Sequence, residues 1–153
     1  MARMEDLVPS EQEHLRALPL PTFDSEPWVE GPPVRQRRVA IVTTAGLSLR
    51  GETLFTMGAG DYRVIPADAK PGDILMSHIS VNFDRTGFQD DVNIVFPIDR
   101  LKEMADAGEI GSVAEFHYSF MGATDTARLE PSARELAGML KEDGVNAVLL
   151  TPV

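Results

Sequence analysis

The 153-residue sequence contains no cysteine, which excludes disulfide bonds and thiolate metal sites within it. It also lacks any apolar run approaching the roughly 20 residues that a membrane-spanning helix needs. The N-terminal stretch MARMEDLVPSEQEHL is polar and acidic, unlike a secretory signal. Together these absences predict a cytoplasmic protein that does not use a membrane as a partner.

Positive charge is scarce as well. The sequence has 14 lysines and arginines against 24 acidic residues, for a net charge of −10. This balance argues against nucleic acid and against anionic membranes as partners, and its simplest interpretation is solubility. Apolar residues make up 43% of the chain, which together with its length predicts a folded domain with a sizeable core.

Residues 1–37 differ from the rest because they hold six of the eleven prolines. A short helix is expected at Ser10–Leu18, where Ser10 can cap the helix and Glu13 completes a capping box. The following arm, residues 19–33, should run extended, with Phe23 and Trp28 anchoring it on the body or on a second subunit. We therefore expect a homodimer in which the arm packs across a neighbour.

Residues 38–153 show strand patterns alternating with helix patterns. This alternation predicts an α/β domain with a three-layer, Rossmann-like, mostly parallel sheet and flanking helices. Helices are expected at Pro97–Ala107 and Pro131–Asp143, with a short strand at Asp61–Ile65. One sheet should contain Val39–Thr43, Ile74–Ile79, Val113–Phe120 and Ala147–Thr151. The last of these is apolar throughout and is therefore expected at the centre of the sheet.

Ligands of parallel sheets bind outside the carboxyl ends of the strands. Three loops should converge there: Thr43–Gly51, Val81–Asn93 and Phe120–Thr126. In the segment His78–Asn93, Arg85 could bind a carboxylate, and His78 could perform acid–base chemistry with an aspartate orienting it. The alternative is a loop held by its own Asx hydrogen bonds, with His78 packed in the sheet.

The segment His117–Gly122 is a second candidate, with His117 and Ser119 on one face of a strand. His78 and His117 could hold a metal with Asp84 or Glu115 as a third ligand, but no spacing requires it. The sequence has neither a Gly-x-Ser-x-Gly elbow nor a P-loop, and its Gly-Ala-Gly precedes a strand, which argues against a dinucleotide fingerprint.

Five stretches carry a family resemblance, in order, over about residues 38–153: RRVAIVTTAGL, GDYRVIP, SHISVNFDRTGFQDDVNIVFPIDRL, GEIGSVAEFHYSFMGAT and LKEDGVNAVLLTPV. They resemble consecutive blocks of the selenoprotein B family of glycine, betaine, sarcosine and D-proline reductases. The N-terminal PLPTFDSEPWVEGPP resembles the short, stand-alone members. In that family the strand matching Val148–Val153 is followed at once by selenocysteine or cysteine, so a UGA codon read as stop would end a chain here.

The resemblance implies a selenol- or thiol-dependent oxidoreductase with a small-molecule substrate, a thioredoxin-like reductant and no further cofactor. The 153 residues alone could not perform the redox step. We expect His78 and Asp84 to act in catalysis beside the redox residue that would follow Val153. Substrate binding is expected from Thr43, Thr44, Asn82, Arg85, Ser119 and Gly122. The alternative is a non-catalytic small-molecule-binding or interaction module with the same fold.

Overall fold

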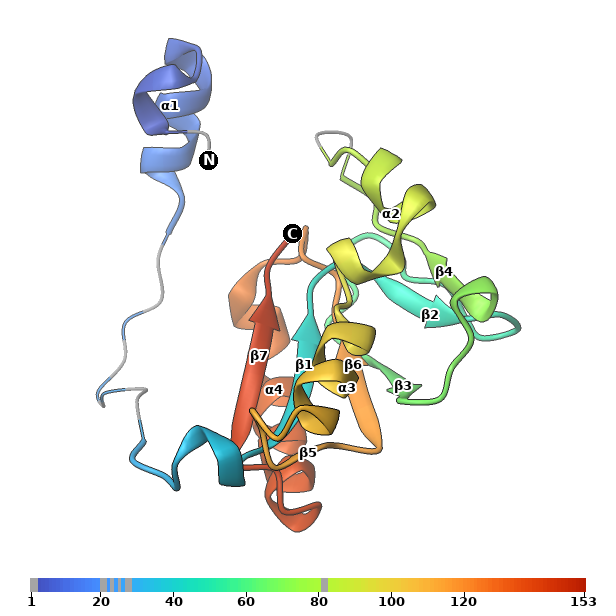
Figure 1. Cartoon of the computed structure of the whole chain (residues 1–153). Helices are drawn as coiled ribbons and strands as arrows, with labels where there is room; N and C mark the ends of the chain where they lie inside the picture. The colour runs from blue at the N-terminus through green and yellow to red at the C-terminus, as the bar shows by residue number, and fades with distance from the viewer. Residues whose placement is uncertain (1–2, 20–21, 23, 25, 27–28, 81–82) are drawn as a thin grey trace.

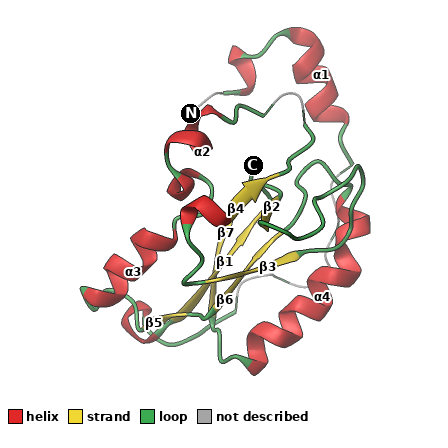
Figure 2. Ribbon diagram, turned by 90° about the vertical axis from the view of Figure 1, so that its right-hand side faces the viewer, coloured by secondary structure: helices red, strands yellow, loops and turns green. Residues whose placement is uncertain are grey.

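The computed structural model describes residues 3–19, 22, 24, 26, 29–80 and 83–153. Figure 1 shows a strand-rich body preceded by a helix that stands away from it. In the turned view of Figure 2 the sheet lies between α3 (Ile98–Asp106) and α4 (Thr126–Glu142). The expected mixed α/β architecture with flanking helices is confirmed, whereas the Rossmann-like layering stays a prediction.

The main sheet is built around β1 (Arg38–Thr43). On one side β1 pairs in parallel with β7 (Ala147–Thr151). On the other side it pairs in parallel with β5 (Ser112–Val113) and then with β6 (Phe116–Ser119). The fifth strand, β3 (Arg63–Pro66), is antiparallel to β6. The strand expected at Asp61–Ile65 is thus present, shifted slightly along the chain.

One predicted strand lies outside this sheet. β4 (Ile74–Met76) pairs with β2 (Leu47–Leu49) in a separate antiparallel two-stranded sheet, so placing Ile74–Ile79 in the main sheet was wrong. The ladder ends where Ser77 is held by the turn after β1: its backbone N–H donates to Gly46 O over 2.9 Å and its hydroxyl to the same oxygen over 3.1 Å.

The apolar last strand lies at an edge, so its expected central position was also wrong. β7 pairs with β1 alone among the described strands. Val148, Leu149 and Leu150 are 41%, 36% and 67% exposed. An unbroken apolar run predicts burial on both faces, but it does not reveal whether a second strand is available to pair with the outer edge.

The helices largely follow their sequence patterns. α3 buries Ile98 and Leu101 and ends before Gly108, whose φ of 67° favours glycine. α4 starts earlier than expected because the Asp125 carboxylate caps it, accepting from Ala127 N over 3.0 Å. The remaining helical turns are η1 (Met4–Asp6), η2 (Val34–Gln36), η3 (Pro71–Asp73), α2 (Thr86–Asp90) and η4 (Val92–Ile94).

The N-terminal helix α1 spans Pro9–Ala17 and buries no residue. Its N-cap is Val8 and Pro9 occupies the first turn, so the predicted capping role of Ser10 was wrong. Proline suits this position because it needs no hydrogen-bond partner for a backbone N–H. Phe23 and Trp28, the proposed anchors of the arm, lie outside the described residues.

Two apolar clusters hold the sheet between its helices. On the α3 face, Ile41 packs with Phe96 and Leu101. On the α4 face, Ala40 and Tyr118 pack with Leu136 and Leu140 of α4 and with neighbouring apolar side chains. Alternate residues of β1 thus contribute to both clusters, as a central strand requires. None of the helices that the structure describes is long and apolar enough to cross a membrane.

Candidate functional site

The parallel strands β1 and β7 end side by side (Figure 1). We call this end of the sheet, where the carboxyl ends of the parallel strands lie, the carboxyl edge. Thr44 N donates to Thr151 O over 3.2 Å. The Thr44 hydroxyl then accepts from Val153 N over 2.8 Å and lies 3.3 Å from Val153 O, to which it donates. Thr44 therefore holds both the N–H and the carbonyl of Val153, and we call this pair of contacts the Thr44 clamp.

Gly122 completes this junction. Its backbone N–H donates to Thr44 O over 2.9 Å. A Cβ atom at this position would lie 2.7 Å from Val153 O and 2.9 Å from Thr44 O, which is closer than such atoms approach. Only glycine lets the turn between β6 and α4 lie against the end of β7. Two of the predicted site residues, Thr44 and Gly122, are thus brought together with Val153.

Thr43 and Ser119 are also at this edge, but both are fully buried and bonded to backbone. The Thr43 hydroxyl donates to Thr151 O over 3.3 Å and accepts from Ala45 N over 3.2 Å. The Ser119 hydroxyl accepts from Leu47 N over 2.7 Å. These side chains shape the turn between β1 and β2, and both hydroxyls are already bonded to backbone groups.

His78 lies against the same turn, because a Cβ atom on Gly46 would be 3.0 Å from His78 N. His78 is 5% exposed, and the centroids of its ring and the Phe83 ring lie 4.9 Å apart. Its Nδ1 accepts from Ser80 N over 3.2 Å, and its Nε2 has no partner among the described residues. Burial, and then the positive charge of Arg85, lower the pKa of His78, so the neutral ring with its proton on Nε2 dominates at neutral pH.

Arg85 and Asp84 are engaged in local contacts. Nη2 of Arg85 donates to His78 O and, over 3.1 Å, to Ser80 O. The exposed Asp84 carboxylate accepts from Thr86 N over 2.9 Å and from the Thr86 hydroxyl over 2.6 Å, which lowers the pKa of Asp84. These are the Asx-type bonds of the alternative interpretation of this segment. Asn82 lies outside the described residues.

The residues that directly follow this segment contact the carboxyl ends of the strands. The Thr151 hydroxyl donates to Val95 O over 3.0 Å, and Val153 packs against the cluster that contains Val95 and Phe96. Sequence reasoning missed Thr151 and Ser77 as residues that position this edge. The sequence offered only a hydroxyl-bearing residue at the end of a strand as a clue to each of them, and such residues are common in turns.

A metal site at these residues finds no support. The described residues contain no group of three or more histidines and carboxylates arranged to hold a metal ion. His117, the proposed second ligand of His78, directs Nδ1 to the backbone N–H of Ile41 over 2.9 Å. The combination of His78, His117 and Asp84 or Glu115 is therefore not supported.

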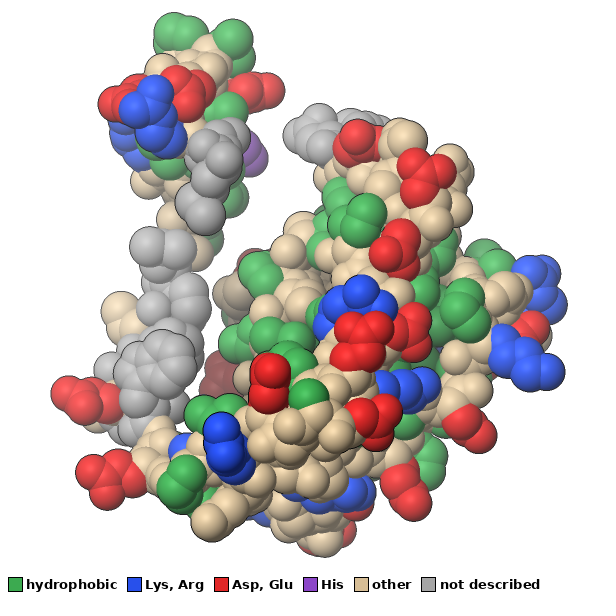
Figure 3. Space-filling view, in the orientation of Figure 1, with side chains coloured by type: hydrophobic (Ala, Val, Ile, Leu, Met, Phe, Trp, Pro, Cys, Tyr) green, Lys and Arg blue, Asp and Glu red, His purple; other side chains and the backbone are tan. Residues whose placement is uncertain are grey.

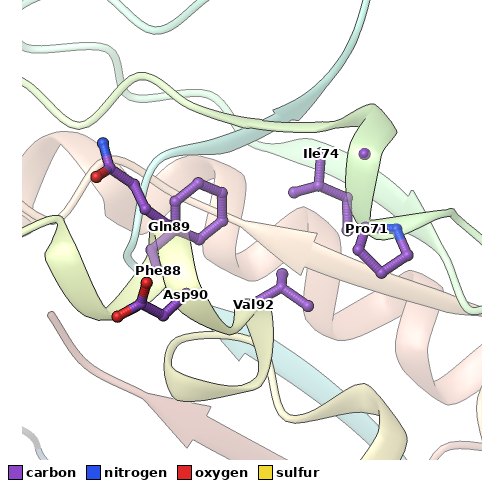
Figure 4. Close-up of a pocket in the computed structure, with 7 residues that line it drawn as sticks. Pro71, Ile74, Phe88, Gln89, Asp90 and Val92 are labelled. Atoms are coloured by element: carbon purple, nitrogen blue, oxygen red, sulfur yellow. The ribbon is translucent and has the colours of Figure 1, made fainter.

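The described surface also has a shallow hollow of about 320 Å³ between η3 and α2, drawn in Figure 4. The Phe88 ring and the Ile74 and Val92 side chains form its apolar part, and the Asp90 carboxylate lies at its rim. None of the predicted site residues lines it. The candidate site is therefore the Thr44 clamp with Gly122 and His78, which is a surface edge rather than an enclosed cavity.

Comparison with known proteins points to one family. The family described as glycine/sarcosine/betaine reductase selenoprotein B (GRDB) matches residues 10–153. The D-proline reductase subunit gamma of Acetoanaerobium sticklandii is 38% identical over 122 residues, covering 77% of this chain and 49% of its own length. The sarcosine reductase complex component B subunit beta of Peptoclostridium acidaminophilum is 31% identical over 142 residues, covering 87% and 32%. The chain thus spans from about a third to a half of these relatives, and no solved structure matches it significantly.

Proposed function

Because the chain belongs to the glycine/sarcosine/betaine reductase selenoprotein B family, we propose that it is the redox component of a reductase acting on a small amine-bearing carboxylate. Relatives are named for D-proline, glycine, betaine and sarcosine reductases, and all four of these compounds contain a carboxylate and a C–N bond. Several relatives are also named as components of complexes, which supports a protein partner for this chain.

The Thr44 clamp is the observation that carries this proposal. It holds Val153 at the carboxyl edge of a mostly parallel sheet, where such sheets place ligands. A selenocysteine or cysteine following Val153 would emerge between Thr44 and the turn leading into α4. A selenolate or thiolate at that point would be the nucleophile, and the nearby start of α4 would favour its negative charge.

Two side chains would serve the reaction at this edge. The neutral imidazole of His78 has a buried Nε2–H that lacks an acceptor among the described residues, so we propose that it donates a hydrogen bond or a proton to a group that reaches it during the reaction. Arg85 uses only Nη2 within the described structure, and its other nitrogens could bind a substrate carboxylate. Asp84 and Asn82 remain proposed contributors, and a thioredoxin-like protein remains the proposed source of two electrons.

A variant extended by cysteine after Val153 tests this function. We expect a thiol pKa below the ordinary value of about 8.5 and a rise in that pKa when His78 is replaced by alanine. With a dithiol reductant and the other components of a reductase complex, one C–N bond of the substrate should be cleaved while the dithiol is oxidised to a disulfide.

The matched control is Asp90→Asn, which removes a carboxylate outside the candidate site. An ordinary thiol pKa that is unchanged in His78→Ala would overturn the redox assignment. Binding of glycine or D-proline without any turnover would instead support a non-catalytic binding module.

A further inference from the structure

The hydrogen-bond ladder between β1 and the neighbouring segment that contains β5 and β6 is interrupted by a bulge. Val39 pairs with Val113, whereas Val42 pairs with Tyr118, so three steps along β1 correspond to five along the neighbouring segment. The extra residues turn away from β1, because Glu115 O accepts from Ala67 N over 2.8 Å. Such bulges disrupt the ladder locally, and their extra residues do not pair with the opposite strand.

Ile41 is the β1 residue that faces this gap. On the same side of β1, Val39 O accepts from Ala114 N and Thr43 O accepts from Phe120 N, both over 2.9 Å. Residues two apart on a strand direct their backbone groups to the same side, so Ile41 N–H points to the bulge. It donates there to His117 Nδ1 over 2.9 Å rather than to a carbonyl.

The imidazole of His117 is suited to accept this bond. It is fully buried and lies edge-on to Phe96, with ring centroids 5.5 Å apart. Burial, followed by the charges of Lys102 and Arg38, lowers the pKa of His117 to about 4, against a smaller opposing effect of Asp143. The ring is therefore neutral. Its proton is on Nε2, and the unprotonated Nδ1 can accept the hydrogen bond.

We propose that His117 is a positioning residue for the carboxyl edge: its Nδ1 replaces the missing carbonyl of the bulge and keeps β1 in register up to Thr44. Thr44 lies three residues beyond Ile41 and carries the clamp on Val153. Ser119 lies two residues after His117, and its side chain likewise accepts from a backbone N–H, that of Leu47. This inference deepens the proposed function, which places the redox residue at the clamp, but the contact itself requires no activity.

The first test is the tautomer of His117 in the 153-residue chain, measured by long-range proton–nitrogen NMR of the imidazole rings. We expect the Nε2–H tautomer at pH 7 and no protonation down to at least about pH 5. A proton on Nδ1, or titration at the ordinary value of about 6.5, would overturn the proposal.

The second test compares His117→Asn with His117→Leu by amide hydrogen exchange. The asparagine oxygen can occupy the place of Nδ1, whereas leucine offers no acceptor. In His117→Leu we expect exchange at Ile41 and Val153 to accelerate about tenfold relative to Leu101 in α3, and in His117→Asn this excess should largely disappear. Equal acceleration at all three amides would indicate a general loss of stability and would contradict a positioning role.

Failure of the proposed function is distinguishable from failure of this inference. If the cysteine-extended chain shows no redox chemistry while His117→Leu selectively frees Ile41 and Val153, the positioning role stands without the reductase. If His117→Leu does not fold, the tautomer of the native chain still decides the matter: the Nε2–H form supports the role, and a proton on Nδ1 contradicts it.

Discussion

Side-chain atoms take several backbone hydrogen-bonding positions around the carboxyl end of β1. Nδ1 of His117 accepts from Ile41 N, and the Ser119 hydroxyl accepts from Leu47 N. The Thr44 hydroxyl accepts from Val153 N. Because each buried donor would be costly to leave without a partner, these residues are constrained by structure as well as by any chemistry they support.

His117 gives the fold a pH dependence that can be measured. Its pKa is about 4 in the folded chain, against an ordinary 6.5, so the unfolded state binds the proton more tightly. The stabilisation is fully present above about pH 6.5 and is lost as pH falls towards 4, to the extent of about 3 kcal/mol. Urea unfolding from pH 7 to pH 4 should show this decline, and His117→Asn should make it shallower. An identical pH profile for both chains would contradict the lowered pKa.

Gly122 is predicted to be sterically irreplaceable. In Gly122→Ala the new methyl group would meet Val153 O and Thr44 O, so we expect the free energy of unfolding to fall by about 1–3 kcal/mol. Gly138→Ala is the matched control, since nothing lies within 4 Å of its Cβ position. In the middle of α4 that change should stabilise by about 0.5–1 kcal/mol. Urea midpoints of the two variants that shift in the same direction would contradict the steric argument.

Among the elements, those with a strong local pattern were predictable. The apolar positions and flanking glycines of α3 and α4 indicated both helices, and the β-branched run at β1 indicated a buried strand. The partners of β4 and β7 were not predictable, because pairing depends on what other segments offer and not on the strand itself. β4 pairs with β2, and β7 takes an edge.

For the candidate site, the sequence predicted where some residues lie but not what they contact. The rule that ligands lie at the carboxyl ends of strands indicated Thr44 and Gly122, which do meet Val153. The bonds of Asp84 with Thr86 follow from Asx chemistry, whereas the contacts of Arg85 with His78 O and Ser80 O had no local signal. The bulge opposite Ile41 had no signal, since it contains no glycine or proline.

The start of α4 should depend on Asp125. Its carboxylate accepts from Ala127 N over 3.0 Å, so we expect Asp125→Ala to lower the free energy of unfolding by about 1 kcal/mol, while Asp125→Asn retains most of it. Ser10→Ala is the control, because Ser10 does not cap α1 and should change the urea midpoint negligibly. A loss at Ser10 equal to that at Asp125 would contradict the capping assignment.

On the scale of the whole molecule, charge and apolar surface act in opposite directions. The net charge of −10 favours separate molecules, and acidic side chains are spread over the face shown in Figure 3. The edge strand β7, however, carries no charged residue and exposes Val148, Leu149 and Leu150. Natural edge strands commonly carry charges that prevent pairing with another chain, and β7 lacks this protection.

We therefore expect the chain to self-associate, most simply as a dimer, with β7 contributing to the contact. A two-fold contact suits such an edge, because two antiparallel β7 strands would satisfy each other's outer backbone groups. Sedimentation or light scattering at high micromolar concentration should show a dimer whose population rises with salt, since salt screens the repulsion between two chains of charge −10. Leu150→Glu should weaken association by at least tenfold, whereas Met57→Glu, at an 87% exposed residue outside the strands, should have little effect. A monomer at every concentration and salt level, or equal effects of the two variants, would contradict a role for β7, and the exposed leucines of that strand would then need another partner to cover them.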